Sequence, residues 1–414
     1  MSLADLTEAA RAAYIFTLPL MEVASPRTQG FSGGAPTNQL AHTRDIVDHT
    51  ARGITTPNND TLYSSAHLDL AQGPVRLTLP PTGERYISLA LMDAYTNNFM
   101  ILGTRTTGGG GGTWTLIGPD APRPAGERVI RAPTRHVWAL YRILVDGEHD
   151  LAAARAVQDG LGLEAGPGEG PGPVALRDAG WADYLRSAIR LMGMNRPFAD
   201  DEAMLARMAP LHLEAFDPGR FSPQEVEAIE AGFALARSQS LRSGLKGPTF
   251  IDGWSYPYGR LGNFGQEYGY RATIALGGLA ALPPEEAMCM RARGNMPRAL
   301  FDGSRAYRLR FAADRLLPVD SFWSLSLYEA TADGQFFFAD NPIRRYSIGD
   351  RTPGLTHNED GSLDIWIGHA DPGPDRRANW LPAPDQPFAL FLRAYLPKPE
   401  LLHSAYRLAP VEEI

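Results

Sequence analysis

A carboxylate flanked by amide side chains stands at the start of a strand-like segment. Asn58, Asn59 and Asp60 come directly before residues 61–69, in which apolar and polar side chains alternate. In a functional interpretation, Asp60 is an acid/base or ligand-orienting group, and the two amides bind substrate. In a structural interpretation, the three side chains bond only to nearby backbone N–H groups in an Asx turn. The sequence leaves both interpretations open.

A second carboxylate lies at the end of another strand-like segment. Asp93 continues the apolar face of residues 86–92, and Tyr95 and Asn97 follow it. A carboxylate on the core-facing side of a strand must be paired or must face a cavity, because an isolated buried charge is very costly. We therefore predict that Asp93 is a second acid/base group and that Tyr95 and Asn97 bind the substrate.

Further side chains could assist these two carboxylates. His42 is a candidate general base because imidazole titrates near neutral pH, and Tyr63 is a candidate acid/base residue beside Asp60. Guanidinium groups could bind an anionic part of a substrate, and aromatic rings could line an apolar part; the candidates are Arg105, Arg271, Trp254 and Tyr268. The alternatives are a structural histidine, internal ion pairs and core packing.

Motifs that hold metals or cofactors are missing from the sequence. It contains no HExxH, CxxC or HxH spacing, and no Rossmann GxGxxG or P-loop pattern. GFSGG (30–34) has the letters of GxSxG but lies in a Gly/Pro/Ser loop, so no GxSxG elbow is expected. The cofactor is therefore unknown, a redox cofactor is not expected, and we predict no metal ligand. An oxygen-ligated Mg²⁺ or Ca²⁺ ion at Asp60 or Asp93 stays open.

The composition is typical of a soluble globular protein, and the partner that we expect is a small-molecule substrate. A net charge of −8 and the lack of a Lys/Arg run argue against nucleic acid. Asp5 and Glu8 interrupt the first apolar run, which argues against a signal peptide, and no run is long enough to span a membrane. Cys289 is the only cysteine. We expect a cytoplasmic protein, and homo-oligomerisation stays open.

Alternating segments near both ends and helical segments in the middle must position these residues. Alternation occurs between residues 61 and 145 and again from residue 307 onward, and helical spacing occurs between residues 181 and 279. We predict an α+β chain with two β-sandwich or jelly-roll-like units and a helical middle segment. The expected limits are 1–163 for the first unit, 164–174 for a Gly/Pro linker, 175–282 for the helical middle and 283–414 for the second unit.

The two β regions resemble each other. RYISLALMDA (85–94) aligns without a gap to SFWSLSLYEA (321–330), so that Ser88 matches Ser324 and Asp93 matches Glu329. One interpretation is that any two alternating strands align in this way. The other is a duplicated β-sandwich unit whose equivalent strands each end in a carboxylate.

Blocks along nearly the whole chain occur in the order of one known family. They include TPNNDTLYSSAHLDL (56–70), RYISLALMDAYTNNFMILGTRTTG (85–108), GNFGQEYGYRA (262–272), FWSLSLYE (322–329) and FLRAYLP (391–397). In these blocks the chain resembles a tandem bacterial family, in which domain of unknown function 1254 is followed by domain of unknown function 1214. The resemblance implies two β-sandwich-like units with helices packed around and between them. It implies no settled biochemical activity.

Two functional hypotheses from different classes follow. The first is an enzyme of specialised metabolism that acts on a small polar or amphipathic molecule, by hydrolase or lyase/isomerase chemistry without a redox cofactor. It requires Asp60, Asp93 and at least one arginine to converge on one concave pocket. The second is a non-catalytic ligand-binding or assembly module built from two β-sandwiches.

Overall fold

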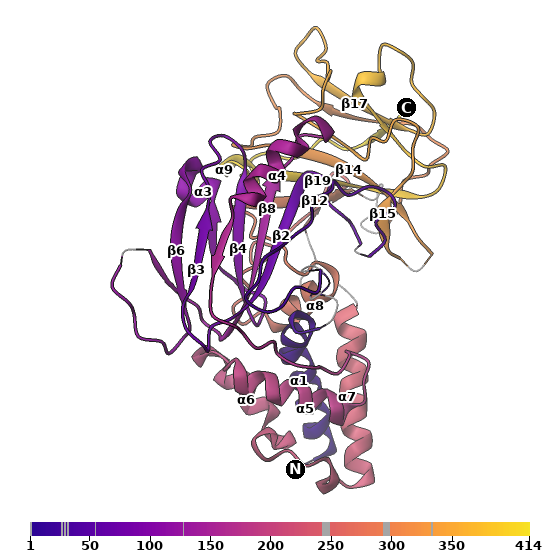
Figure 1. Cartoon of the computed structure of the whole chain (residues 1–414). Coiled ribbons are helices and arrows are strands. Elements are labelled where there is room, and N and C mark those ends of the chain that lie inside the picture. Colours follow the sequence, from indigo (N-terminus) through magenta and orange to yellow (C-terminus); the bar gives the residue numbers. More distant parts are fainter. Residues whose placement is uncertain are drawn as a thin grey trace.

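The computed structural model describes residues 2–414 apart from positions 26, 27, 29, 31, 32, 54, 127, 242–248, 293–298 and 333. Within these residues the chain forms two β-sandwiches and a group of helices (Figure 1). The predicted α+β class with two β-sandwich units and a helical segment is confirmed. None of the described helices has the length and apolar composition that crossing a membrane requires.

The first sandwich consists of two sheets that pack on each other through their apolar faces. One sheet has the strand order β1-β2-β8-β4-β5, and the other has the order β7-β6-β3-β9. The core between them contains Leu77, Leu89 and Leu116, which lie on the inward side of alternating strands. The strands are β1 (Ala41–His42), β2 (Thr61–Asp69), β3 (Val75–Leu79), β4 (Ile87–Asp93), β5 (Asn98–Gly103), β6 (Gly112–Ile117), β7 (Val129–Arg131), β8 (His136–Leu144) and β9 (Gly162–Glu164).

The second sandwich is built in the same way. One sheet has the order β10-β11-β12-β19-β14-β15, with β16 also paired to β14, and the other has the order β18-β17-β13-β20. Leu309, Leu325 and Leu392 are buried between these sheets. The strands are β10 (Thr249–Ile251), β11 (Trp254–Tyr256), β12 (Ala287–Ala292), β13 (Tyr307–Phe311), β14 (Trp323–Ala330), β15 (Phe336–Phe338), β16 (Ser347–Gly349), β17 (Leu363–Gly368), β18 (Trp380–Pro382), β19 (Phe388–Tyr395) and β20 (Glu412–Glu413).

The two sandwiches are equivalent in topology and in register. From β2 to β9 and from β12 to β20, equivalent strands follow each other in the same chain order, apart from the added β15. Each sandwich contains one parallel pair at the same place, β6 with β7 and β17 with β18. Ser88 of β4 lies opposite Arg142 of β8, and Ser324 of β14 lies opposite Arg393 of β19. This agreement supports the interpretation of a duplicated unit.

One close backbone approach recurs in both sandwiches. A Cβ atom on Gly103 would lie 2.1 Å from the carbonyl oxygen of Ile87, and a Cβ atom on Gly349 would lie 2.1 Å from that of Trp323. Only glycine fits at either position, because real Cβ atoms do not approach a carbonyl oxygen so closely. The repeat of this constraint is further support for the duplication.

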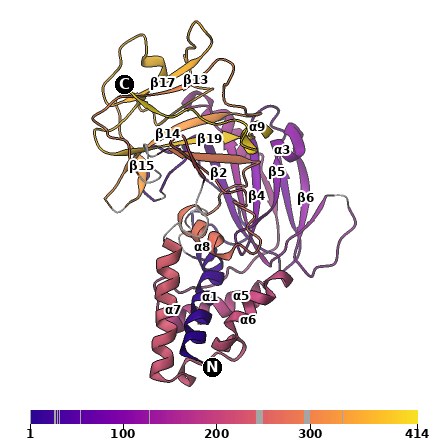
Figure 2. The same ribbon diagram turned by 180° about the vertical axis from the view of Figure 1, so that it is seen from behind.

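Five of the described helices gather at one end of the molecule, below the first sandwich in Figures 1 and 2. The N-terminal helix α1 lies at the centre of this group and packs against the other four helices. Its first turn is capped by Ser2, whose Oγ accepts a hydrogen bond from the Asp5 N–H. The helices of the group are α1 (Leu3–Val23), α5 (Trp181–Met194), α6 (Glu202–Met208), α7 (Pro223–Leu241) and α8 (Tyr268–Gly277).

Short helices connect the other elements. The α-helical ones are α3 (Thr104–Thr107), α4 (Leu151–Asp159) and α9 (Pro399–Leu402). Single 3₁₀ turns occur at Gly108–Gly110, Glu148–Asp150, Ala199–Asp201, Ala209–Leu211, Leu213–Ala215, Pro218–Arg220 and Arg377–Asn379. Residues 165–180 contain neither a helix nor a strand.

The segment that precedes the first strand of each sandwich, β2 or β12, packs against the other sandwich. Thr56, which precedes β2, accepts a hydrogen bond from Arg393 Nη2, and Ala280, which precedes β12, accepts one from Arg142 Nη2. Both residues have a positive φ, 53° at Thr56 and 67° at Ala280. The two contacts are equivalent, because in each an arginine of one sandwich binds the segment that precedes the first strand of the other. Reciprocal contacts of this kind are expected when two halves are related by an approximate two-fold axis. We call this interface between the β2–β8–β4–β5 and β12–β19–β14–β16 sheets the seam.

Candidate functional site

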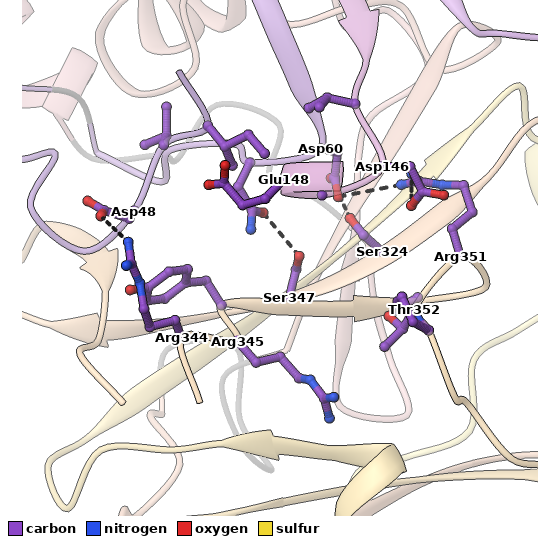
Figure 3. Close-up of a pocket in the computed structure, with 18 of the residues that line it drawn as sticks. Asp48, Asp60, Asp146, Glu148, Ser324, Arg344, Arg345, Ser347, Arg351 and Thr352 are labelled. Atoms are coloured by element: carbon purple, nitrogen blue, oxygen red, sulfur yellow. Dashed lines mark hydrogen bonds and ion pairs between the residues drawn. The ribbon is translucent and has the colours of Figure 1, made fainter. Parts of the chain in front are cut away.

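A cavity of about 570 Å³ opens at one end of the seam (Figure 3). Both sandwiches line it, the first with residues 46–48, 59–60 and 145–149, and the second with residues 323–324, 343–347, 349 and 351–353. Apolar side chains such as Val47, Val145 and Trp323 share this lining with charged ones. The seam cavity is therefore suited in size and character to a small amphipathic molecule.

Asp60 lies where the seam cavity meets the start of β2. Its side chain is only 4% exposed, and its Oδ2 atom accepts a hydrogen bond of 2.5 Å from Ser324 Oγ of the other sandwich. Arg351 Nη2 lies 3.9 Å from Asp60 Oδ1, and no described residue donates a hydrogen bond to that oxygen. Asp60 is therefore a largely buried carboxylate with one oxygen held by the protein and the other without a close donor.

The two amides beside Asp60 have different surroundings. Asn59 lines the seam cavity, and its Oδ1 accepts a hydrogen bond from Ser347 Oγ at 3.0 Å. Asn58 is directed into the seam, where its Nδ2 donates to the Tyr395 hydroxyl at 2.8 Å. The Asn58 Oδ1 atom also accepts from the Asp60 N–H, which is the Asx turn of the structural interpretation. The segment from Asn58 to Asp60 thus forms an Asx turn and also lies beside the seam cavity.

Tyr63 lies behind Asp60 within the seam and is not among the described lining residues of the cavity. Its hydroxyl accepts a hydrogen bond of 3.4 Å from Asn58 Nδ2, and the Arg142 guanidinium lies 5.5 Å from its ring centre. Burial alone would raise the pKa of Tyr63, but the Arg142 charge and the hydrogen bonds from Asn58 and Thr61 bring it below its ordinary value. Asn58, which bonds both the Tyr63 hydroxyl and the Asp60 N–H, links Tyr63 to Asp60.

Carboxylates outnumber the arginines that face the seam cavity. The lining contains Asp48, Asp60, Asp146 and Glu148 together with Arg344, Arg345 and Arg351. Figure 3 shows Arg345 directed away from Asp60, and its Nη1 donates to the carbonyl oxygens of residues 377, 378 and 380. Arg344 pairs with Asp48 at 3.3 Å, and Arg351 pairs with Asp146 at 3.1 Å. The remaining charge of the cavity is negative.

Asp93 and Asp60 do not share a pocket. Strands β2 and β4 both run antiparallel to β8, and Asp93 lies at the level of Leu68, near the far end of β2. At about 3.3 Å per residue, the two carboxylates are roughly 25 Å apart along the sheet. The prediction of one pocket that holds both is therefore wrong, because strands that run in the same direction place a leading and a trailing residue at opposite edges.

The side chains around Asp93 form a buried turn. Asp93 is 2% exposed, and its carboxylate accepts hydrogen bonds from the N–H groups of Tyr95 and Asn97 and from Asn97 Nδ2. The Tyr95 hydroxyl donates to the Asn195 carbonyl oxygen. Burial raises the pKa of Asp93 to about 6, although the hydrogen bonds from Asn97 oppose this shift. These contacts make Asp93 part of a structural turn, in which burial makes the ionised form of its carboxyl group unfavourable.

The raised pKa of Asp93 predicts a pH-dependent loss of stability. A carboxyl with a folded pKa near 6 and an unfolded pKa near 4 binds more protons in the folded state, so stability falls as pH rises between these values. Asp93→Asn, which cannot ionise, is expected to gain about 2–3 kcal/mol relative to the wild type between pH 4 and pH 7. Urea unfolding of both proteins at the two pH values measures this; a constant difference would contradict it.

Arg271 lies in an aromatic environment close to the Asp93 turn. It is fully buried, and no described group accepts a hydrogen bond from its Nε, Nη1 or Nη2 atoms. The rings of Phe16, Tyr95 and Tyr268 lie 5.2–5.5 Å from its guanidinium. Tyr268 is in turn fixed by a 2.8 Å hydrogen bond from its hydroxyl to Asp201. The structure thus groups Arg271, Tyr95 and Tyr268 with Asp93 and away from the seam cavity.

The remaining predicted residues lie in three other places. Arg105 pairs with the buried Glu286 at 2.6 Å within the seam. Trp254 is fully buried in the core of the second sandwich, and its Nε1 donates to the Ala409 carbonyl oxygen, in agreement with core packing. His42 lies on β1, where its Nδ1 contacts Ser64 Oγ at 2.7 Å, and burial and Arg44 lower its pKa. None of the three lines the seam cavity.

A metal site has no support in the described part of the chain. Among these residues, no three His, Cys, Asp or Glu side chains are grouped so that they could hold an ion. The carboxylates of the seam cavity instead pair with arginine or serine, as at Asp48, Asp60 and Asp146.

Ser324 and Arg351 are site residues that the sequence did not single out. They come from the second sandwich and reach Asp60 only because the two halves fold onto each other. A signal for them exists in the repeat. LGTR (102–105) and IGDR (348–351) begin at the ends of the equivalent strands β5 and β16. Extending the alignment of residues 85–94 and 321–330 to these blocks would pair Arg105 with Arg351.

The comparisons with known families agree with the division into two sandwiches. A family described as "Protein of unknown function (DUF1254)" matches residues 37–165, and one described as "Protein of unknown function (DUF1214)" matches residues 286–399. No curated protein matches the chain.

One of two similar solved structures supports the fold. The VPA0106 protein from Vibrio parahaemolyticus aligns with a TM-score of 0.74 at 22% sequence identity, over 100% of both chains. An uncharacterised protein from Burkholderia cenocepacia aligns with a TM-score of 0.48 at 14% identity, over 99% of this chain and 94% of that chain. At these identities the first alignment supports the fold alone, and the second carries no argument.

Proposed function

The chain belongs to the tandem family in which a DUF1254 domain is followed by a DUF1214 domain, and we propose that its seam cavity is the active site of an enzyme. The substrate is a small polar or amphipathic molecule. The chemistry is of the hydrolase or lyase/isomerase type and uses the Asp60 carboxylate alone as its acid/base group, because the shared pocket with Asp93 that the enzyme hypothesis first required does not exist. The reaction needs no redox cofactor.

The observation that carries this proposal is the state of Asp60. A carboxylate that is 4% exposed normally has both oxygens satisfied, whereas Asp60 Oδ1 receives no hydrogen bond from any described residue. The 2.5 Å hydrogen bond from Ser324 fixes the orientation of the carboxylate. An oriented carboxylate with one unengaged oxygen beside a cavity is well placed to accept a proton from a bound molecule or from water.

The rest of the lining supports the proposed substrate class. Asn59 offers an amide within the cavity, and Glu148 is an exposed carboxylate at its rim. The apolar surface of Val47, Val145 and Trp323 favours a substrate with a hydrocarbon part. A cytoplasmic location stays part of the proposal and is supported by the single free cysteine, Cys289. A role in specialised metabolism also stays part of the proposal.

The alternative function is a non-catalytic ligand-binding or assembly module. One observation favours it: Asp60 joins the two sandwiches through Ser324 and Arg351, so its charge also has a structural use. In that case the seam cavity binds a molecule without changing it. The two functions differ in whether a bound metabolite is consumed.

An untargeted metabolite screen tests the proposal. The purified protein and its Asp60→Asn variant are incubated with a cell extract, and consumed and formed metabolites are identified by mass spectrometry. The wild type is expected to consume at least one metabolite and form its product, and Asp60→Asn is expected to leave both unchanged. Identical profiles from the two folded proteins would count against the enzyme, and enrichment of a metabolite without conversion would support the binding module.

A further inference from the structure

The seam has a second end that repeats the Asp60 site. The registers of the two sandwiches place Asp60 and Glu286 at equivalent positions, since each stands three residues before the residue opposite the seam arginine, Tyr63 opposite Arg142 and Cys289 opposite Arg393. The same registers pair Ser324 with Ser88, Phe322 with Tyr86 and Arg351 with Arg105. The seam thus carries two equivalent carboxylates, one from each sandwich.

The Glu286 end is closed by the protein's own donors. The Glu286 side chain is fully buried, its Oε1 accepts a hydrogen bond of 2.9 Å from the Tyr86 hydroxyl, and its Oε2 accepts one of 2.6 Å from Arg105 Nε. Both donors come from the other sandwich. At this end each carboxylate oxygen therefore has a close donor, and one of these donors is a cation.

The Asp60 end lacks the cationic donor. The Ser324 hydroxyl occupies Oδ2, but Arg351 is 3.9 Å from Oδ1, compared with 2.6 Å for Arg105 at Glu286. Two differences explain the longer distance: aspartate is one methylene shorter than glutamate, and Arg351 is drawn to Asp146 at 3.1 Å. In addition, Phe322 supplies no hydroxyl donor of the kind that Tyr86 supplies to Glu286. At the Asp60 end, the position equivalent to that of Arg105 is therefore part of the seam cavity.

The charge of the side chains that line this place favours a cation; Arg393, whose charge also acts on Asp60, does not line the cavity. Asp48, Asp146 and Glu148 line the cavity together with Asp60, whereas Arg344 and Arg351 are each paired with one of these carboxylates. An anion would meet this negative surplus, and a neutral molecule would gain nothing from it. A bound cation would give Asp60 Oδ1 a charge-assisted hydrogen bond, which is stronger than a neutral one.

We propose that the ligand of the seam cavity is a small organic cation whose ammonium, amidinium or guanidinium group donates an N–H to Asp60 Oδ1, in the place that Arg105 fills at Glu286. This inference rests on the proposed function and names its substrate class. The apolar wall of Val47, Val145 and Trp323 receives the hydrocarbon part of the cation.

A pair of matched probes tests the ligand class. Butylguanidinium and its neutral isostere butylurea are titrated calorimetrically, at low salt, into the wild type, Asp60→Asn, Glu148→Gln and Glu230→Gln. Glu148 is an exposed residue at the cavity rim, and Glu230 is an exposed residue of α7 that makes the same charge change far from the seam. Circular dichroism confirms that each variant is folded.

The wild type is expected to bind butylguanidinium at least about tenfold more tightly than butylurea, and Asp60→Asn is expected to lose about tenfold or more of that affinity. Glu148→Gln should weaken binding about twofold to fivefold, and Glu230→Gln should not change it. Equal affinity for both probes, undiminished affinity in Asp60→Asn, or no binding up to about 10 mM would overturn the inference. If Asp60→Asn does not fold, an unchanged affinity in Glu148→Gln would overturn it.

The inference and the proposed function can fail separately. If the metabolite screen finds an Asp60-dependent conversion of a neutral or anionic compound, the enzyme stands and the cationic ligand class is overturned. If butylguanidinium binds as expected but no metabolite is consumed, the ligand class stands and the enzyme is overturned.

Discussion

Replacing Asp60 with asparagine is expected to lower the turnover of the substrate by about 10²- to 10⁴-fold, the usual contribution of a positioned acid/base group. Asparagine has the same shape but cannot accept a proton at neutral pH. The larger part of the loss should fall on kcat, and the weaker contact with a cationic substrate should add about a tenfold rise in KM, while the amide oxygen still accepts the hydrogen bond from Ser324. Steady-state kinetics on the metabolite found in the screen measure this.

The folded state of Asp60→Asn should survive, which keeps the kinetic result interpretable. Arg351 retains its 3.1 Å contact with Asp146, and Asn58 retains its hydrogen bond to Tyr395. Ser324→Ala serves as a companion variant, since it leaves the carboxylate in place but removes its orienting donor. We expect a loss of about tenfold for Ser324→Ala. Wild-type turnover in Asp60→Asn would remove Asp60 from the mechanism.

Replacing Arg105 with methionine is expected to destabilise the protein by about 3 kcal/mol or more. The change leaves Glu286, which is fully buried, with only the Tyr86 hydroxyl as a partner. A buried carboxylate that loses its cation is costly, because the Tyr86 hydroxyl and the charge of Arg142 compensate it only in part. Urea unfolding at pH 7 gives the free energy of unfolding of the wild type and the variant.

Two further variants show whether this loss of stability comes from the carboxylate of Glu286, which no longer has its arginine partner. Arg351→Met, the equivalent change at the open end, should cost less than about 1.5 kcal/mol, because Arg351 is 3.9 Å from Asp60 and Asp60 keeps Ser324. Adding Glu286→Gln to Arg105→Met should recover most of the lost stability, because no buried charge remains. A double variant as unstable as Arg105→Met would mean that packing, not charge, causes the loss.

The stability of Arg105→Met should also depend on pH in a defined direction. Burial already raises the pKa of Glu286, against the opposing effect of Arg105 and Tyr86, and removing Arg105 raises it further. The folded state of the variant then binds a proton more readily than the unfolded state, so its deficit should shrink as pH falls from 7 toward 5. A deficit that is independent of pH would contradict this.

The sequence predicted the elements of the fold because local patterns determine them. Alternation over residues 61–69 and 86–93 corresponds to β2 and β4, and the similarity between residues 85–94 and 321–330 corresponds to equivalent strands of two sandwiches. These features depend on which side chains face a core, and a period of two in the sequence reports that directly.

The sequence could not predict which carboxylates come together. Asp60 and Asp93 both stand at strand ends, but the common direction of β2 and β4 separates them, and that direction is a property of the sheet order. The expected likeness of Asp93 and Glu329 is also limited to the strand. Asp93 is enclosed in its own turn, whereas Glu329 pairs with Arg52 of the first half.

The site itself is formed by contacts between distant parts of the chain. Ser324 and Arg351 contact Asp60 because the segment that precedes β2 packs against the second sandwich. The residue types around Asp60 and Glu286 also do not show that the two positions are equivalent. For example, Tyr63 in the first sandwich is equivalent to Cys289 in the second. Register, and not residue identity, carries this relation.

A crystal structure of the Asp60→Asn variant soaked with the metabolite that the wild type consumes tests the central claim most directly. The variant binds the substrate without converting it, so the complex can accumulate. The predicted result is a molecule in the seam cavity, between the start of β2 and Ser324, with a cationic N–H group within hydrogen-bond distance of the side chain of residue 60. A metabolite bound elsewhere, for example near Arg271 in the helical region, with the seam cavity unchanged, would contradict the account.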